Sequence, residues 1–184
     1  MQFDPSSFTH IPYTGFKSQI YRSAMPNKES LECFKENLRI HKIYHVVILC
    51  ESKESAIKLK DFYDEADVKV IAFPIKDFCI PEKAPLLGLV KKIMDIANQP
   101  EQNILIHCKA GIGRTGLILA SLVMEQSPEM THTEAIDWVR EVIPGAVESP
   151  PQKDFLENYR EPVSINKSTG FFETLWNFLS WNKN

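Results

Sequence analysis

The chain has few of the features that mark several specialised classes of protein. It has no apolar stretch long enough to cross a bilayer and no N-terminal pattern of a secretory signal. Its cysteines lie too far apart in the sequence for the paired spacing of a zinc site, and there are only four: Cys33, Cys50, Cys79 and Cys108. We therefore expect a cytoplasmic protein with reduced thiols, and we expect no metal or other cofactor.

Charge of one sign is not in excess either. The chain has 21 Lys and Arg residues against 24 Asp and Glu residues, a net charge of −3. Because this balance offers no basic surplus for a polyanion, we do not expect nucleic acid as a partner. The chain has 184 residues, of which 43% are hydrophobic and 24% charged, which is the composition and length of a single globular domain.

Short apolar runs typical of buried strands alternate with segments of helical spacing. This alternation predicts an α/β domain over residues 1–162, with a central, mostly parallel sheet flanked by helices. We expect an irregular lead-in over the first fifteen residues, and an edge strand over 19–23. Further strands are expected at 45–50, 68–75 and 103–106, and helices at 28–38, 52–66 (capped by Ser52), 85–98, 117–124, 131–142 and 149–159.

The most informative segment is residues 107–116, His-Cys-Lys-Ala-Gly-Ile-Gly-Arg-Thr-Gly. It joins a predicted buried strand to a predicted buried helix, so its backbone N–H groups and the helix N-terminus would form an anion-binding cradle. The same positive field favours the thiolate form of Cys108, which is the nucleophilic form. Arg114 can hold two phosphate oxygens with its planar guanidinium. A nucleophile within a phosphate cradle predicts covalent phosphoryl transfer.

These residues resemble the signature of the cysteine-based protein tyrosine phosphatase superfamily, H-C-x-x-G-x-x-R-[ST]-G, at every defined position. The resemblance implies the Cys-x5-Arg phosphatase fold, with Cys108 as nucleophile and Arg114 as phosphate ligand. It also implies that Thr115 hydrogen-bonds the sulfur and that His107 sets the loop geometry. The remaining phosphate-binding residues would be Lys109, Ala110, Gly111, Ile112 and Gly113.

A general acid is needed to protonate the leaving oxygen, and it should lie on a loop that covers the bound ester. Residues 73–81, which we call the acid loop, follow a predicted strand and contain two prolines. They resemble the acid loop of small dual-specificity phosphatases, and this implies that Asp77 is the acid. The alternative candidates, Asp61 and Asp64, lie within a predicted helix. A loop aspartate can also serve only to cap its turn.

A late segment, Val147 to Gln152, resembles a loop of tyrosine-specific members in which a glutamine orients the hydrolytic water. Glu148 stands in that place here, so the role does not transfer directly. Gln152 has two candidate roles. It can assist water, or it can close a capping box with Ser149 at the start of the last helix, and we favour the second.

The chain is too short for the insertions of large tyrosine-specific domains, and the resulting shallow pocket favours an atypical dual-specificity phosphatase. Its partner would be a phosphorylated protein carrying phosphotyrosine, phosphoserine or phosphothreonine. Lys109 after the nucleophile also resembles lipid-directed members, so phosphoinositide or other non-protein phosphatase activity is the alternative. An inactive phosphobinding module is a remote third reading, because the nucleophile, the arginine and an acid candidate are all present.

The composition changes after residue 162. Residues 163–170 read as a linker, and residues 171–181 hold seven large apolar side chains with a narrow polar face. Such a segment can lie on a membrane surface or dock on its own domain or on a second copy. We favour docking, because the segment lacks the basic face that attracts anionic lipid.

Overall fold

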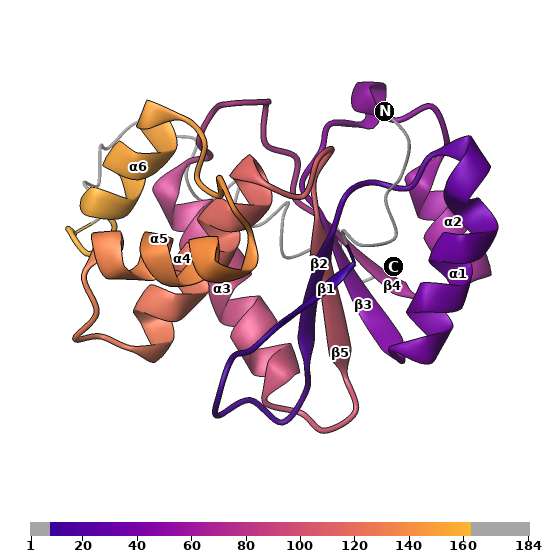
Figure 1. Ribbon diagram of the computed structural model, residues 1–184, viewed down its shortest axis with the longest axis horizontal. Coiled ribbons are helices and arrows are strands. Elements are labelled where there is room, and N and C mark those ends of the chain that lie inside the picture. Colours follow the sequence, from indigo (N-terminus) through magenta and orange to yellow (C-terminus); the bar gives the residue numbers. More distant parts are fainter. Residues whose placement is uncertain (1–7, 163–184) are drawn as a thin grey trace.

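The computed structural model of the protein describes residues 8–162 and has a mixed sheet at its centre (Figure 1). The strand order is β1-β2-β5-β3-β4, and only the β1–β2 pairing is antiparallel. The sequence prediction of a mostly parallel sheet is therefore confirmed. The strands are β1 (Thr9–Ile11), β2 (Ile20–Ser23), β3 (Ile43–Ile48), β4 (Lys69–Ala72) and β5 (Asn103–His107).

Helices cover both faces of the sheet. In Figure 1, α1 (Leu31–Ile40) and α2 (Leu59–Glu65) lie on one side of it. The other side carries four helices: α3 (Lys83–Ala97), α4 (Gly113–Gln126), α5 (His132–Val142) and α6 (Pro150–Glu157). Two short 3₁₀ helices, η2 (Lys28–Ser30) and η3 (Ser52–Glu54), precede α1 and follow β3.

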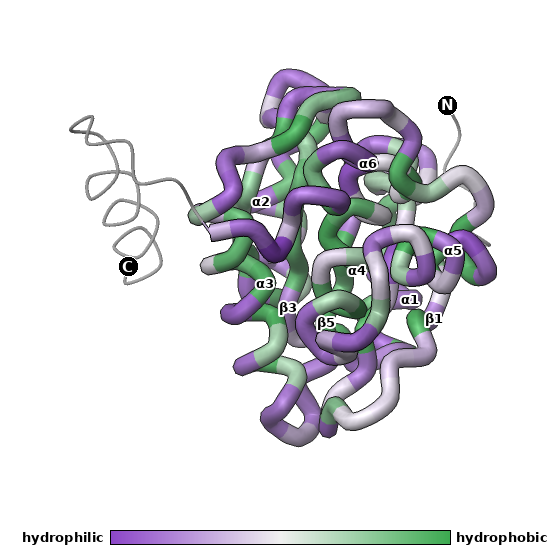
Figure 2. Tube along the Cα trace, turned by 90° about the vertical axis from the view of Figure 1, so that its left-hand side faces the viewer, coloured by the Kyte–Doolittle hydropathy of each residue, from purple (hydrophilic) through white to green (hydrophobic). Residues whose placement is uncertain are grey.

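The core has two apolar layers, one on each face of the sheet. The larger layer joins β5 to α3, α4, α5 and α6, and the smaller one lies under α1 and α2. Figure 2 shows hydrophobic stretches around β3, β5 and α3. The first twelve residues of α4 are all buried, because this helix packs against α3, α5 and α6 as well as the sheet. The segment between β5 and α4 is therefore held on both sides by core elements.

Two sequence expectations about local structure are wrong. The first fifteen residues contain β1, so residues 19–23 form an internal strand rather than an edge strand. β1 has only three residues, and its strand geometry comes from pairing with β2. The local sequence has no pattern that predicts this pairing. Ser52 does not cap a long helix: Glu51 is the N-cap of η3, and α2 begins only at Leu59.

Both capping boxes near the end of the domain occur in the structure. Thr131 and Glu134 close the first turn of α5, and Ser149 and Gln152 close that of α6. Among residues 8–162, no helix is both long and apolar enough to cross a membrane. The predicted linker and aromatic segment, residues 163–184, lie outside the described residues.

Candidate active site

The signature segment forms the loop between β5 and α4, at the carboxyl end of the central strand. Cys108 follows β5 directly and is 2% exposed, and α4 begins at Gly113 without a side-chain cap. The first backbone N–H groups of α4 are therefore available to an anion. The sequence prediction of a strand, a loop and a helix start around Cys108 is confirmed.

One glycine is required for this loop to pack as it does. Gly111 has a φ of +73°, and a Cβ at this position would overlap the carbonyl oxygen of Ser23 in β2. The loop thus lies directly against the backbone of β2, because only a residue without a Cβ fits there. On its other side, the carboxylate of Glu148 lies next to Gly113, but this is the end of a flexible side chain that can move aside.

Several buried polar atoms in β2 and at the start of α4, next to this loop, are available for a ligand. Nε of Arg114, Oγ1 of Thr115 and Oγ of Ser23 have no hydrogen-bond partner within residues 8–162. Buried polar atoms are normally paired, so each exception needs an explanation, and a catalytic role is one of them. Thr115 is fully buried on the first turn of α4, one residue after Arg114, which is consistent with its predicted role beside the sulfur.

Arg114 connects three segments that are far apart in the sequence. Its two terminal nitrogens donate to both carboxylate oxygens of Glu54 at 2.6 and 2.8 Å, and Nη1 also donates to the carbonyl oxygen of Ile75 at 2.9 Å. Nη2 lies 3.1 Å from Oδ1 of Asp77. Arg114 is 2% exposed. Burial alone would lower the pKa of Arg114, but its hydrogen bonds to Glu54 and the charges of Cys108, Glu54 and Asp77 outweigh it and raise that pKa.

Glu54 is the first of two residues at this site that the sequence analysis did not predict. Its hydrogen bond with Arg114 lowers the pKa of its carboxyl group, so it stays ionised beside the arginine. Its Oε1 also accepts a hydrogen bond from the backbone N–H of Glu51 at 2.8 Å, which fixes η3. A signal was present, because Glu54 follows β3, the strand beside β5. The sequence analysis did not use this position, because it placed Glu54 within one long helix that begins at Ser52.

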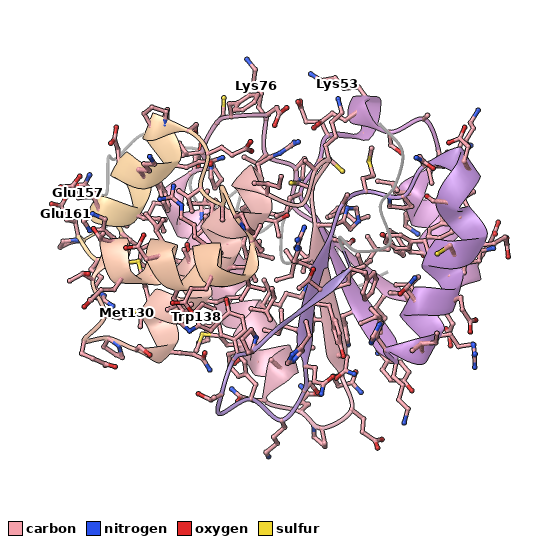
Figure 3. All side chains as sticks on the ribbon, viewed as in Figure 1. Lys53, Lys76, Met130, Trp138, Glu157 and Glu161 are labelled. Atoms are coloured by element: carbon pink, nitrogen blue, oxygen red, sulfur yellow. The ribbon has the colours of Figure 1, made fainter. Side chains whose placement is uncertain are left out.

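The acid loop brings Asp77 to the phosphate-binding loop. The side chain of Asp77 is half exposed and its carboxylate contacts Arg114, as stated above. In Figure 3, Lys76 of this loop and Lys53 of η3 project from the same end of the molecule. The alternative candidates lie elsewhere: Asp61 and Asp64 are exposed on α2 and pair with Lys58 and Lys60. Of the three aspartates, only Asp77 is placed beside Arg114.

His107 is completely buried and takes part in a short hydrogen-bonded chain. Its Nδ1 lies 3.2 Å from the carbonyl oxygen of Cys108, and its Nε2 lies 2.8 Å from the hydroxyl of Tyr63 in α2. A carbonyl only accepts, so Nδ1 carries the proton and the Tyr63 hydroxyl donates to Nε2. Burial lowers the pKa of His107 to about 4, which keeps the ring neutral. Tyr63, the second residue that sequence reasoning missed, thus fixes the ring that precedes the nucleophile.

The remaining predicted residues divide into a lining set and a supporting set. Lys109 is exposed, and its carbonyl oxygen accepts from the backbone N–H of Met25 at 3.1 Å. Ala110 and Ile112 are partly exposed in the same loop. Gln152 is 1% exposed and its side chain accepts from the N–H of Ser149, which confirms the capping role.

Glu148 lies against the start of α4. The backbone before it is unusual, since the buried Val147 has a φ of +57°, a region that β-branched residues rarely adopt. Arg140 stabilises this path by donating to the carbonyl oxygen of Ala146 at 3.0 Å. The path places the exposed Glu148 with its carboxylate next to Gly113, at the entrance of the phosphate-binding loop.

All four cysteine thiols are free. Cys50 is buried two residues after β3, and burial, together with the charges of Glu54 and Cys108, raises the pKa of its thiol to about 12. It therefore remains protonated at neutral pH and is a poor nucleophile.

A cysteine after a central parallel strand, a glycine-bearing loop and an arginine on the next helix are the arrangement of a cysteine-based protein tyrosine phosphatase. The family model for the catalytic domain of dual specificity phosphatases matches residues 25–162. The chain therefore belongs to the dual specificity phosphatase family.

Curated relatives agree with this assignment. Human dual specificity protein phosphatase CDC14C is 30% identical over 147 residues, which cover 79% of this chain and 30% of that protein. Human dual specificity protein phosphatase CDC14A is 40% identical over 80 residues, or 44% of this chain and 13% of that protein. The chain thus matches less than a third of the length of either relative.

Solved structures show the same fold over most of the chain. The crystal structure of Tk-PTP in the active form has a TM-score of 0.70 and 28% identity, and covers 84% of this chain and 97% of that one. Kinase associated phosphatase, with a serine in place of its catalytic cysteine, has a TM-score of 0.76 over 87% of this chain and 95% of that one. At 20% identity, the second likeness concerns the fold alone.

Replacing Glu54 with glutamine should destabilise the protein, because the buried guanidinium of Arg114 would keep only the half-exposed Asp77 as a charged partner. We expect Glu54→Gln to lower the free energy of unfolding by roughly 3 kcal/mol, measured by urea denaturation at pH 7. Glu36→Gln is the matched control, since its ion pair with Arg39 on α1 is at the surface and its loss should change stability by less than about 0.5 kcal/mol. Equal stability of the two variants would contradict the role assigned to Glu54.

The buried neutral His107 should make stability depend on pH. Its pKa rises from about 4 in the folded protein to the ordinary 6.5 on unfolding, so the unfolded state binds more protons between these values. Stability should therefore be complete above pH 6.5 and fall, by on the order of 3 kcal/mol, as the pH is lowered to 4. Urea denaturation across this range should give a weaker pH dependence for His107→Gln than for the wild type. The same dependence in both proteins would refute a buried neutral ring.

Proposed function

We propose that the domain hydrolyses phosphate monoesters of proteins, with phosphotyrosine, phosphoserine and phosphothreonine as substrates. The observation that carries the proposal is the position of Arg114, which joins the loop of Cys108 to the acid loop of Asp77. Nucleophile, phosphate ligand and acid then meet at one edge of the sheet. The family membership and the phosphatase relatives support the same reaction.

The first step forms a cysteinyl phosphate. The thiolate of Cys108 attacks phosphorus while Arg114 and the N–H groups at the start of α4 hold the phosphate oxygens. The ester P–O bond breaks, its electron pair moves to the leaving oxygen, and protonated Asp77 supplies the proton. The product alcohol or phenol leaves, and a Sγ–P bond remains.

The second step releases inorganic phosphate. Asp77, now a carboxylate, accepts a proton from water as the water oxygen attacks phosphorus. The Sγ–P bond breaks and its electron pair returns to sulfur, where the hydroxyl of Thr115 can donate a hydrogen bond. The acid and base roles thus alternate on one side chain.

Residues 171–181 and the cellular location belong to the proposal as well. We favour a cytoplasmic enzyme whose aromatic segment docks on its own domain or on a second copy. A membrane-surface contact of the same segment is the alternative. The support is the sequence of the segment, which is apolar and has no basic face.

Phosphate release from a matched panel of substrates tests the proposal. The panel holds phosphotyrosine, phosphothreonine and phosphoserine peptides beside phosphoinositide vesicles. We expect turnover of the peptides, and a loss of kcat/KM of about 10⁴-fold or more in Cys108→Ser. If the wild type binds the peptides but releases no phosphate, the domain is a phosphobinding module. Turnover of the lipids alone would reject a protein substrate.

Replacing the general acid should slow the reaction most where the leaving group is poor. We expect Asp77→Asn to lower kcat on a phosphoserine peptide by roughly 100-fold, and to lower it less on p-nitrophenyl phosphate, whose leaving group needs little protonation. The alkaline limb of the pH–rate profile should also disappear. Asp64→Asn is the control and should match the wild type. An unchanged alkaline limb in Asp77→Asn would remove Asp77 from this role.

A further inference from the structure

Exposed apolar side chains gather next to the general acid. Within residues 8–162, four large hydrophobic residues are exposed, and two of them, Phe78 at 59% and Ile80 at 41%, follow Asp77 within three positions. The other two, Ile40 and Tyr44, lie at the end of α1 and the start of β3. They are therefore near the amino end of the parallel strands, on the opposite edge of the sheet from the site.

The outward position of Phe78 is imposed by the fold. Its φ of +58° lies in the left-handed region, which costs a non-glycine residue on the order of 1 kcal/mol or more. Two hydrogen bonds hold this turn: the N–H of Cys79 donates to the carbonyl of Lys76 at 3.0 Å, and the hydroxyl of Ser149 donates to the carbonyl of Phe78 at 2.9 Å. Strain that the surrounding structure maintains at a site is a reason to look for a function.

The patch formed by Phe78 and Ile80, which we call the acid-loop patch, adjoins the phosphate site. The residue before it, Asp77, contacts Arg114, so the patch begins one residue away from a side chain that touches the proposed phosphate ligand. Successive residues of an extended peptide advance by about 3.3–3.6 Å. The patch is therefore within reach of a side chain one or two positions from the phosphorylated residue.

The charges around the patch fit a peptide better than a lipid surface. Lys76 and Glu82 flank the patch in the sequence and are both exposed. Lys109 in the phosphate-binding loop and Glu148 next to Gly113 are exposed as well. These two lysines and two glutamates balance each other, so they give no surplus of positive charge to attract an anionic bilayer.

We propose that Phe78 and Ile80 bind an apolar side chain of the substrate, one or two residues away from the phosphorylated residue. The acid-loop patch would then select among phosphoproteins, while the phosphate-binding loop performs the reaction. This inference rests on the proposed function, and it adds a class of substrate: phosphopeptides with an apolar residue close to the phosphate.

The test compares peptides that differ at one position. Four positions are varied one at a time: the two residues before the phosphorylated residue and the two after it. At each position one phosphopeptide carries leucine and its partner carries glycine, and kcat/KM is measured for both. Partial burial of a leucine side chain should give the wild type roughly a tenfold preference for leucine at one of these positions. Phe78→Ser and Ile80→Ser should each bring this ratio to within about twofold of one.

Two controls separate recognition from chemistry. Ile40→Ser and Tyr44→Ser remove exposed apolar side chains from the opposite edge of the sheet, and they should keep the wild-type ratio. p-Nitrophenyl phosphate has no flanking residue, so Ile80→Ser should hydrolyse it at the wild-type rate. A wild type inactive on this compound would reject the proposed function. In that case the patch can still be tested by binding. The dissociation constants of the leucine and glycine peptides are compared between Cys108→Ser and the double variant that also carries Ile80→Ser.

Two results would overturn the inference. One is that the wild type shows no preference for leucine over glycine, or that Phe78→Ser and Ile80→Ser both keep this preference. The other is loss of phosphoinositide-vesicle turnover in the patch variants with unchanged peptide ratios, which would make the patch a lipid contact.

Discussion

The ion pair between Arg114 and Glu54 is the interaction on which the site depends. Both side chains are almost completely removed from solvent, with exposed fractions of 2% and 11%, so neither charge could remain there alone. The pair is possible because β3 and β5 are adjacent and parallel, and their carboxyl ends open at the same edge of the sheet. From there Arg114 also reaches the carbonyl of Ile75 after β4. One guanidinium thus sets the relative positions of three chain segments.

The parts of this architecture that local sequence specifies could be predicted. A buried strand, a glycine-bearing loop and a buried helix around Cys108 follow from the apolar pattern, and the capping boxes at Thr131 and Ser149 from side chains three residues apart. The position of Asp77 near the phosphate-binding loop could be expected because its loop follows a strand of the same sheet, whereas its role as the acid was predicted from the resemblance to small dual-specificity phosphatases. These features need only residues that are close in the sequence, or a known rule for sheet edges.

The parts that depend on distant contacts could not be predicted. β1 has only three residues and exists through its pairing with β2. Glu54 looked like part of a long helix, and its partner lies 60 residues away. Tyr63 looked like one more apolar residue of α2, although its hydroxyl bonds to His107 across 44 residues. In each case tertiary structure selects among conformations that the local sequence leaves open.

The contact of α4 with residues 146–148 has a consequence for how such a sequence can diverge. Gly113 and Gly116 are three positions apart, hence on the same face of the helix, and a Cβ on Gly116 would come within 2.8 Å of Ala146 and of the backbone nitrogen of Val147. The packing of α4 therefore depends on the course of the backbone at residues 146 and 147 far more than on which side chain is exposed at position 148. A change of residue type at position 148 leaves that course intact. A one-residue insertion or deletion nearby would change that course and disturb its close packing against Gly116, so length variation should be confined to other connections of the domain.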